Sequence, residues 1–359
     1  MSSFRRSAAN VALTVVSAIV GLLLVEIGYR ALRDPSLLLH WPNFAELNRA
    51  QRLPTPLPYD VEIGFFPSPN IDRPGEHTDA EGFRVMPPLP EGAIADRPVV
   101  AVGDSFVYGL GADDHESWPA VLQTELRRRT INAGMRGFGF DQSVLLAERL
   151  AKKFKPSVIV VSFISDDLRR SEMSRLWNIE KPWFEVADGK AVLHKARATL
   201  GAGDAPLSFW QRALGRSLLA ARFWPAIEGV EDELFGRRER ALPPGEGETV
   251  ACALMERLAA IGTPVLVLAQ YDHRPWTQPE QDGGAQHRAA QKVLHCARQA
   301  KLATLDSYDA VDRIARTQGV RAIYEKEPGA HHNAAGNRLI AQLITDALAK
   351  DRLLPVNRP

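Results

Sequence analysis

The chain has 359 residues, of which 45% are hydrophobic and 24% are charged. This balance favours a large folded α/β core over an intrinsically disordered chain. The formal net charge is only +1, and no basic run or alternation of basic and aromatic residues occurs, so the composition argues against a nucleic-acid partner.

An apolar stretch stands near the N-terminus. Residues Ala8 to Val25 are almost uninterruptedly apolar, and two arginines precede them without an acidic residue. Helical continuation to Leu32 gives the length that a bilayer requires, and no small-residue cleavage site follows. We therefore expect a cytoplasmic tail over 1–10 and a single-pass transmembrane signal anchor over 11–32, in preference to a cleaved signal peptide. Because the basic end stays inside, the rest of the chain is expected in the periplasm.

Residues 33–96 contain 11 prolines. Proline lacks the backbone N–H and fixes φ, so long helices and central strands are excluded there. We expect this segment to be a lead-in that spaces the folded domain, at 97–349, from the membrane. A short tail over 350–359 completes the chain.

The lead-in is followed by a short apolar run, Val99 to Val102, that stops at Gly103-Asp104-Ser105. This pattern predicts a buried strand that carries a serine at its carboxyl end. There the N-terminus of a following helix favours developing negative charge, so Ser105 is a candidate nucleophile, with an ordinary turn as the alternative. The nucleophile elbow of α/β-hydrolases needs glycine where this chain has Val107, which argues against that family.

Further strand candidates alternate with helices along the chain. The strands are expected at 130–133, 157–163, 264–269 and 303–305, with helices near 248–261 and 285–300. This rhythm predicts a flavodoxin-like three-layer α/β/α fold with a five-stranded parallel sheet. The glycines between Gly134 and Gly139 do not match the dinucleotide fingerprint, so no cofactor is predicted.

Residues 170–245 interrupt this rhythm and are rich in tryptophan and phenylalanine. Asp188-Gly189 stands between two β-like runs and predicts a hairpin. An insertion at this point is expected over the carboxyl ends of the strands. Aromatic side chains there can stack on sugar rings, although packing against the domain is the commoner use.

Two adjacent histidines, His331 and His332, precede the last predicted helix. Histidine suits a general base because its pKa lies near neutrality. A metal site is a weaker interpretation, since adjacent histidines cannot share a helix face and no His-Glu-x-x-His pattern occurs. No metal is therefore predicted.

Taken in order, these segments resemble the sequence blocks of the SGNH (GDSL) hydrolases over roughly 97–349. The Gly103-Asp104-Ser105 turn resembles block I, Asn132 to Gly137 resembles block II, and the His331 segment resembles block V. The resemblance implies that Ser105 is the nucleophile, that His331 is the base, and that the backbone N–H of Gly137 binds the oxyanion. In addition, Gly82-Phe83-Arg84 is similar to an element that precedes block I in membrane-anchored bacterial members.

Two departures from the family pattern stand out. The oxyanion asparagine of block III maps onto Asp166, and an ionised carboxylate can only accept a hydrogen bond. Asp166 must therefore be protonated to donate, or its side chain must point away. The aspartate that precedes the block V histidine is also missing, which leaves Glu327, Asp306 or a bare Ser–His dyad as alternatives.

The resemblance implies a serine esterase with an acyl-enzyme mechanism. The expected substrates are O-acyl groups of an extracytoplasmic glycan or other small esters, including lipid esters. An O-acyltransferase that uses the same serine, and a non-catalytic glycan-binding or scaffold protein with the same fold, remain open. Cys252 and Cys296 lie on helices predicted to flank the fourth strand, where a disulfide and two free thiols are both possible.

Overall fold

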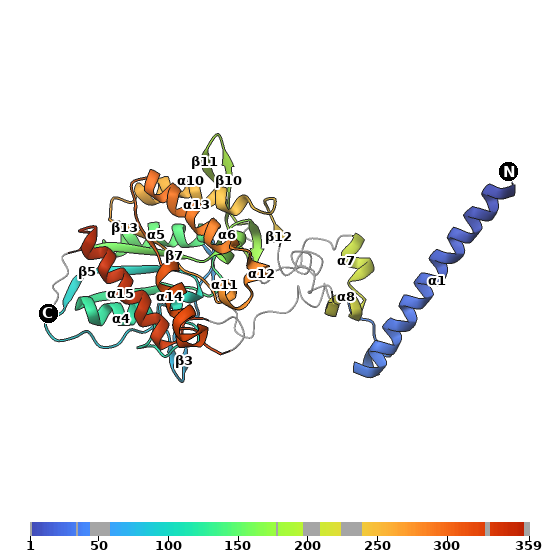
Figure 1. Cartoon of the computed structure of the whole chain (residues 1–359), viewed down its shortest axis with the longest axis horizontal. Coiled ribbons are helices and arrows are strands. Elements are labelled where there is room, and N and C mark those ends of the chain that lie inside the picture. Colours follow the sequence, from blue (N-terminus) through green and yellow to red (C-terminus); the bar gives the residue numbers. More distant parts are fainter. Residues whose placement is uncertain are drawn as a thin grey trace. The chain divides into compact units, whose positions relative to one another are not determined.

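The computed structural model describes residues 2–33, 35–43, 58–176, 179–196, 209–223, 239–326 and 331–354 (Figure 1). The chain divides into two compact units. The smaller unit comprises residues 1–54, 175–179 and 199–239, and the larger unit comprises residues 55–174, 180–198 and 240–359.

A five-stranded parallel sheet forms the centre of the larger unit. Its strands are β5 (Ile94–Gly103), β6 (Arg128–Gly134), β7 (Val158–Phe163), β13 (Val265–Ala269) and β14 (Ala303–Asp306). They are ordered β14-β13-β7-β5-β6, with all pairs parallel. Because the first strand of the sheet lies between the second and the third, this is the flavodoxin-like order, and the predicted fold class is confirmed.

Helices cover both faces of the sheet (Figure 1). They are α4 (Trp118–Leu126), α5 (Phe140–Phe154), α10 (Glu246–Ala259), α13 (Ala285–Gln299) and α15 (Ala334–Lys350). Helices α4 and α15 pack on one face, against a core that includes Val158 and Val160 of β7. Side chains alternate along a strand, so Ile159 and Val161, which are also fully buried, face α5, α10 and α13. A central strand that is apolar on both faces is what this layering requires.

Further helices lie in the segments that follow the carboxyl ends of the strands. These are α3 (Ser105–Tyr108), α6 (Ser165–Arg170), α11 (Arg274–Thr277), α12 (Pro279–Asp282), α14 (Tyr308–Gln318) and the 3-10 turn η3 (Val320–Ala322). A separate apolar cluster of Phe106, Ile164, Val311, Ile323 and Tyr324 packs several of them together at this edge.

Part of the proline-rich segment belongs to the larger unit. It forms two short hairpins, β1 (Tyr59–Asp60) with β2 (Gly64–Phe65) and β3 (Asp72–Arg73) with β4 (Glu76–His77). Phe65 is fully buried, and its ring lies 5.4 Å from that of Phe138. Residues 58–93, which the proline content predicts to be a spacer, instead pack with the sheet domain.

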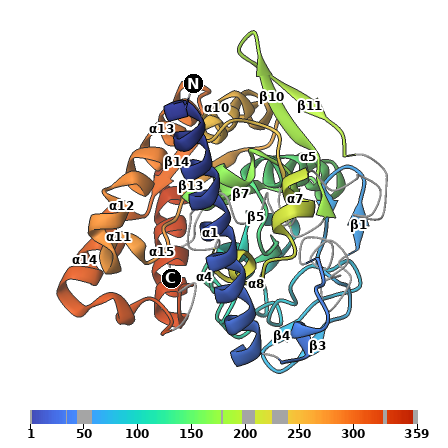
Figure 2. The same ribbon diagram turned by 90° about the vertical axis from the view of Figure 1, so that its right-hand side faces the viewer.

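The predicted insertion is divided between the two units. Strands β10 (Trp183–Ala187) and β11 (Lys190–His194) form an antiparallel hairpin in the larger unit (Figure 2). Its turn places Asp188 and Gly189 at φ of 50° and 73°, so the predicted hairpin is confirmed. Residues 199–239 instead join the smaller unit. Three short strands, β8 (Met173–Leu176), β9 (Ile179–Glu180) and β12 (Glu239–Arg240), lie near the boundaries.

The smaller unit is built on the N-terminal helix α1 (Ser2–Arg33). It also holds η1 (Pro35–Leu38), α7 (Phe209–Leu214) and α8 (Leu218–Phe223). Within α1, residues Asn10–Arg33 are long and apolar enough to cross a membrane. Two charged residues near the end of α1 are buried: Arg30 Nε donates to Glu26 at 2.7 Å, and Glu26 accepts from the Leu218 N–H at 2.7 Å.

The two cysteines form a disulfide. Cys252 on α10 is bonded to Cys296 on α13, with 5.2 Å between their Cα atoms. The bridge therefore joins two neighbouring helices on one face of the sheet, and it resolves the alternative that the sequence left open.

Candidate active site

Ser105 lies at the carboxyl end of β5, as the first residue of α3. Asp104 caps this short helix, because its Oδ1 accepts a hydrogen bond from the Phe106 N–H at 2.9 Å. Glycine is required at 103, since a Cβ there would lie 2.5 Å from Val107 Cγ2. The chain therefore turns sharply from strand to helix, and Ser105 lies at the carboxyl ends of the parallel strands.

His331 lies next to Ser105 in the structure, although it comes from near the C-terminal end of the chain. Its Nε2 lies 2.8 Å from Ser105 Oγ, although 226 positions separate the two residues in the sequence. Asn333 starts the helix that follows, because its Oδ1 accepts hydrogen bonds from the Ala335 and Gly336 N–H groups. His331 is thereby held on a short segment directly before α15.

The neighbouring His332 points elsewhere. It is only 3% exposed, its ring stacks on Tyr324 with 4.8 Å between the centroids, and it meets the edge of Phe106 at 5.3 Å. The structure thus brings His331 to the serine and places His332 in the apolar cluster behind it.

The charge state of His331 follows from its surroundings. Burial lowers the pKa of His331, and the positive charges of Arg170 and Arg136 lower it further, to about 4. The imidazole is therefore neutral at pH 7, which is the form that can accept a proton from the serine hydroxyl.

No described carboxylate accepts a hydrogen bond from His331 Nδ1. Asp306, one of the two candidate acids, accepts instead from Tyr271 Oη at 2.8 Å and from the Tyr308 N–H at 2.9 Å. It ends the edge strand β14, which lies three strands from β5 and hence roughly 14 Å away. The structure therefore does not bring Asp306 to His331, which argues against this alternative. Glu327, the other candidate, lies outside the described residues.

Two backbone amides near Ser105 lack acceptors in the described part of the chain. Ser105 is the first helical residue, so its N–H has no partner within the helix. Gly137 is buried at φ 71°, in the turn after β6, and its N–H also lacks an acceptor among the described residues. Strands β5 and β6 are neighbours with Gly103 opposite Gly134, so both amides come from the same edge of the sheet. Such amides are the donors that an oxyanion requires.

Asp166 does not have the environment of a protonated donor. Its Oδ2 accepts from Arg170 Nη2 at 2.9 Å, and its Oδ1 accepts from Arg169 Nε at 3.1 Å. Burial alone would raise the pKa of Asp166, but these two arginines hold it well below its usual range. The side chain is therefore an ionised acceptor bound to its own helix, which argues against the alternative in which a protonated Asp166 donates to the oxyanion.

Arg170 is the charged residue that inspection of the sequence missed. Its guanidinium contacts three carboxylates, donating to Asp167 Oδ1 at 2.7 Å as well as to Asp166, and lying 3.7 Å from Asp104 Oδ2. Burial raises the pKa of Asp167, and the nearby charge of Asp104 raises it further, so Arg170 compensates a crowded acidic site. The sequence does contain a signal for this cluster. Asp166 and Asp167 stand four and three residues before Arg170, and residues with that spacing are neighbours on a helix.

Within the described ranges, no group of three or more His, Cys, Asp or Glu side chains is arranged to hold a metal ion.

Comparison with known proteins gives a similarity of fold only. No protein-family model matches the chain, and no curated protein matches it. Among solved structures, LAE5, an alpha/beta hydrolase enzyme from the metagenome of Lake Arreo in Spain, has 16% identity and a TM-score of 0.43, covering 71% of this chain and 95% of that one. TesA has 17% identity and a TM-score of 0.40, with 72% and 99% covered. A single-residue variant of Axe2, an acetyl xylan esterase from Geobacillus stearothermophilus, has 12% identity and a TM-score of 0.44, with 71% and 96% covered. Similarity at this level carries no inference about what this chain does.

Proposed function

We propose that the protein is a serine esterase in which Ser105 is the nucleophile and His331 is the base. The observation that carries this proposal is the 2.8 Å separation between His331 Nε2 and Ser105 Oγ, at the carboxyl edge of a parallel sheet. A hydroxyl gains nucleophilic strength when a neutral imidazole can take its proton.

In the proposed reaction, His331 takes the Ser105 proton as Oγ attacks the ester carbonyl carbon. The carbonyl oxygen becomes an oxyanion, which the Ser105 and Gly137 amides bind. The tetrahedral intermediate collapses by breaking the bond to the alcohol oxygen, and His331 returns the proton to that oxygen. Water then attacks the acyl-enzyme by the same route and releases the acid.

We further propose that the substrate is an O-acylated glycan outside the cytoplasm. Two features support this location. Helix α1 has the length and composition of a membrane span, and Cys252 and Cys296 are bonded, as oxidising compartments permit. The sugar part of the proposal rests on the family resemblance in the sequence. The same serine would also serve an acyltransferase, which hands the acyl group to a sugar hydroxyl instead of water.

A fluorophosphonate probe tests the nucleophile, because only an activated serine reacts. The wild-type protein should be labelled, whereas Ser105→Ala should not, and His331→Ala should lose nearly as much because the two act as a unit. His332→Leu is the matched control and should keep its labelling, since this ring does not face Ser105. Folded wild-type protein that fails to react would favour the non-catalytic alternative.

Two further measurements test the substrate and the location. Release of free acetate from an acetylated oligosaccharide supports hydrolysis, and appearance of acetate on an added acceptor sugar supports transfer. A reporter that is active only outside the cytoplasm, fused after residue 359, should work; activity of a cytoplasmic reporter would contradict export.

A further inference from the structure

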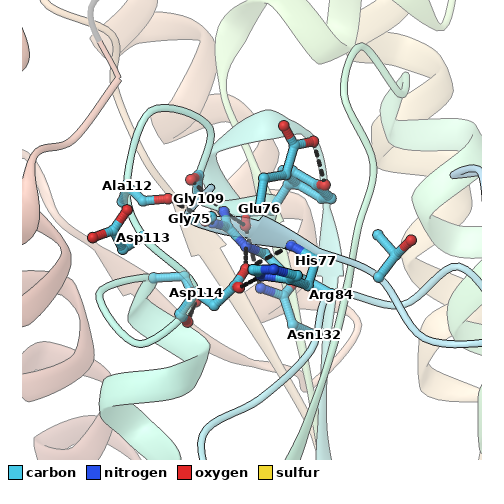
Figure 3. Close-up of polar contacts among 12 residues, drawn as sticks. Gly75, Glu76, His77, Arg84, Gly109, Ala112, Asp113, Asp114 and Asn132 are labelled. Carbon is cyan, nitrogen blue, oxygen red and sulfur yellow. Dashed lines mark hydrogen bonds and ion pairs between the residues drawn. The ribbon is translucent and has the colours of Figure 1, made fainter. Parts of the chain in front are cut away.

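Arg84, in the lead-in before β5, has an unusually complete set of hydrogen bonds. It is only 2% exposed. An arginine has five guanidinium N–H groups, and here each has an acceptor. Nε donates to Asp114 Oδ1 at 2.8 Å, Nη1 donates to the carbonyls of Tyr108 and Gly109 at 2.8 and 2.5 Å, and Nη2 donates to those of Gly75 and Ala112 at 2.7 and 2.5 Å. Figure 3 shows the Arg84 side chain with Asp114 and the loop residues around it.

Two of these hydrogen bonds, to the carbonyls of Tyr108 and Gly109, hold the end of the helix that begins at Ser105. Helix α3 has only four residues, too few to be stable through its own hydrogen bonds. It ends at Tyr108 and is capped by Gly109, whose N–H donates to the Ser105 carbonyl at 3.0 Å. The Gly109 carbonyl in turn accepts from Arg84 Nη1. Arg84 therefore fixes the residue that closes the turn on the Ser105 backbone.

A second path runs from Arg84 to β6. The backbone N–H of Arg84 donates to the Asn132 carbonyl at 3.2 Å, and Asn132 Nδ2 donates to the Tyr108 carbonyl at 3.3 Å. Asn132 Oδ1 also accepts from the Gly134 N–H at 3.1 Å, at the end of the strand that leads to Gly137. Arg84 is thus bonded to both segments that carry the serine and the proposed oxyanion amides.

We infer that Arg84 is a positioning residue for Ser105, which aligns the serine hydroxyl with His331 by holding the end of α3. This inference rests on the proposed function for its catalytic consequence. The planar fork of arginine can bond several carbonyls in one plane, whereas lysine has three donors on a single point. By this inference, the segment before β5 contributes to the active site by positioning Ser105.

The rate of labelling by a fluorophosphonate probe measures the alignment. Arg84→Ala should lower the rate constant by about 100-fold, because small displacements of reacting groups cost that much. Arg84→Lys should lose nearly as much, since it keeps the charge and loses the fork. Millimolar guanidinium should restore labelling of Arg84→Ala, while equal urea or sodium chloride should not.

Arg149→Ala is the matched control. Arg149, on α5, also ties the lead-in to the domain through Asp60, at 2.6 and 2.8 Å, but its hydrogen-bond partners among the described residues do not include any residue of α3. This variant should label at the wild-type rate. If Arg84→Ala does not fold, as circular dichroism would show, Arg84→Lys decides the matter, and labelling of that variant at the wild-type rate would overturn the inference.

Hydrogen exchange separates failure of this inference from failure of the proposed function. Amide exchange in a peptide spanning residues 105–112 should rise several-fold in Arg84→Lys and stay unchanged in Arg149→Ala, whether or not the protein reacts with the probe. Unchanged exchange in both variants would show that Arg84 does not hold this turn. Wild-type protein that shows the exchange difference but no labelling would contradict the esterase and leave the structural link intact.

Discussion

Asp166 Oδ2 lies 2.9 Å from Arg170 Nη2, so the carboxylate that the sequence resemblance matches with an oxyanion asparagine is paired with an arginine four residues later. The pair changes the expected chemistry of the site. An ionised acceptor bound to a guanidinium cannot donate to an oxyanion, and the positive charge of Arg170 also reaches His331, where it lowers the pKa.

Replacing Asp166 by asparagine tests this arrangement. The resemblance alone would predict a gain in activity, because an asparagine amide can donate. In the structure the new NH2 group would instead meet the donor of either Arg169 or Arg170, while the remaining oxygen accepts from the other arginine. We expect Asp166→Asn to lower the rate of probe labelling at pH 7 by a few-fold, because Arg170 keeps its bond to Asp167. A rise of about 100-fold, the usual value of one oxyanion donor, would contradict this prediction.

The acid limb of the activity profile should lie unusually low. His331 must be neutral to act as the base, and burial together with Arg170 lowers its pKa to about 4. Activity should therefore remain nearly constant from pH 7 to pH 5 and fall by half near pH 4, as measured by the labelling rate on folded protein. A midpoint between pH 6 and 7, the ordinary range of histidine, would show that the imidazole is solvated or paired with an acid.

His332 should make the fold sensitive to acid. Burial lowers the pKa of His332, and the neighbouring His331 lowers it further, to about 3. Below the unfolded-state pKa of about 6.5, the unfolded chain binds a proton that the folded chain does not, so the free energy of unfolding falls as the pH drops toward 3. The slope from this group is about 1.4 kcal/mol per pH unit.

The matching measurement is urea denaturation at pH 7 and pH 5. His332→Leu should lose less stability between these pH values than the wild type, because leucine does not titrate. His295→Gln, on the exposed side of α13, is the control and should behave as the wild type does. Equal losses in all three proteins would mean that His332 does not control acid stability.

The disulfide should contribute stability without touching the chemistry. Cys296 lies in the last turn of α13, which leads into the amino end of β14, so the bridge is expected at the edge of the sheet opposite Ser105. Replacing both cysteines by alanine should lower the free energy of unfolding by about 2–4 kcal/mol while the labelling rate at 25 °C stays unchanged. Loss of labelling in a variant that still folds would contradict that separation.

Local sequence patterns predicted most of the fold. Three elements are determined by residues that are adjacent in the sequence, so their periodicity and turn residues predict them directly. These are the apolar run of Val158 to Phe163, the Gly103-Asp104-Ser105 turn and the Asp188-Gly189 hairpin. The order of the strands followed from the alternation of strands and helices. The sequence also identified Ser105, His331 and Gly137 as candidates for the nucleophile, the base and an oxyanion donor.

Tertiary structure alone decided which of these groups meet and in what charge state. Three features depend on how elements pack rather than on local sequence. They are the hydrogen bonds of Arg84, the separation of Asp306 from His331, and the packing of His332 against Tyr324. The same holds for the pKa of His331, which burial and nearby charges set through space. Hydrophobic periodicity identifies which face of an element is buried, but it carries no information about which polar group lies opposite, because that depends on how the elements pack.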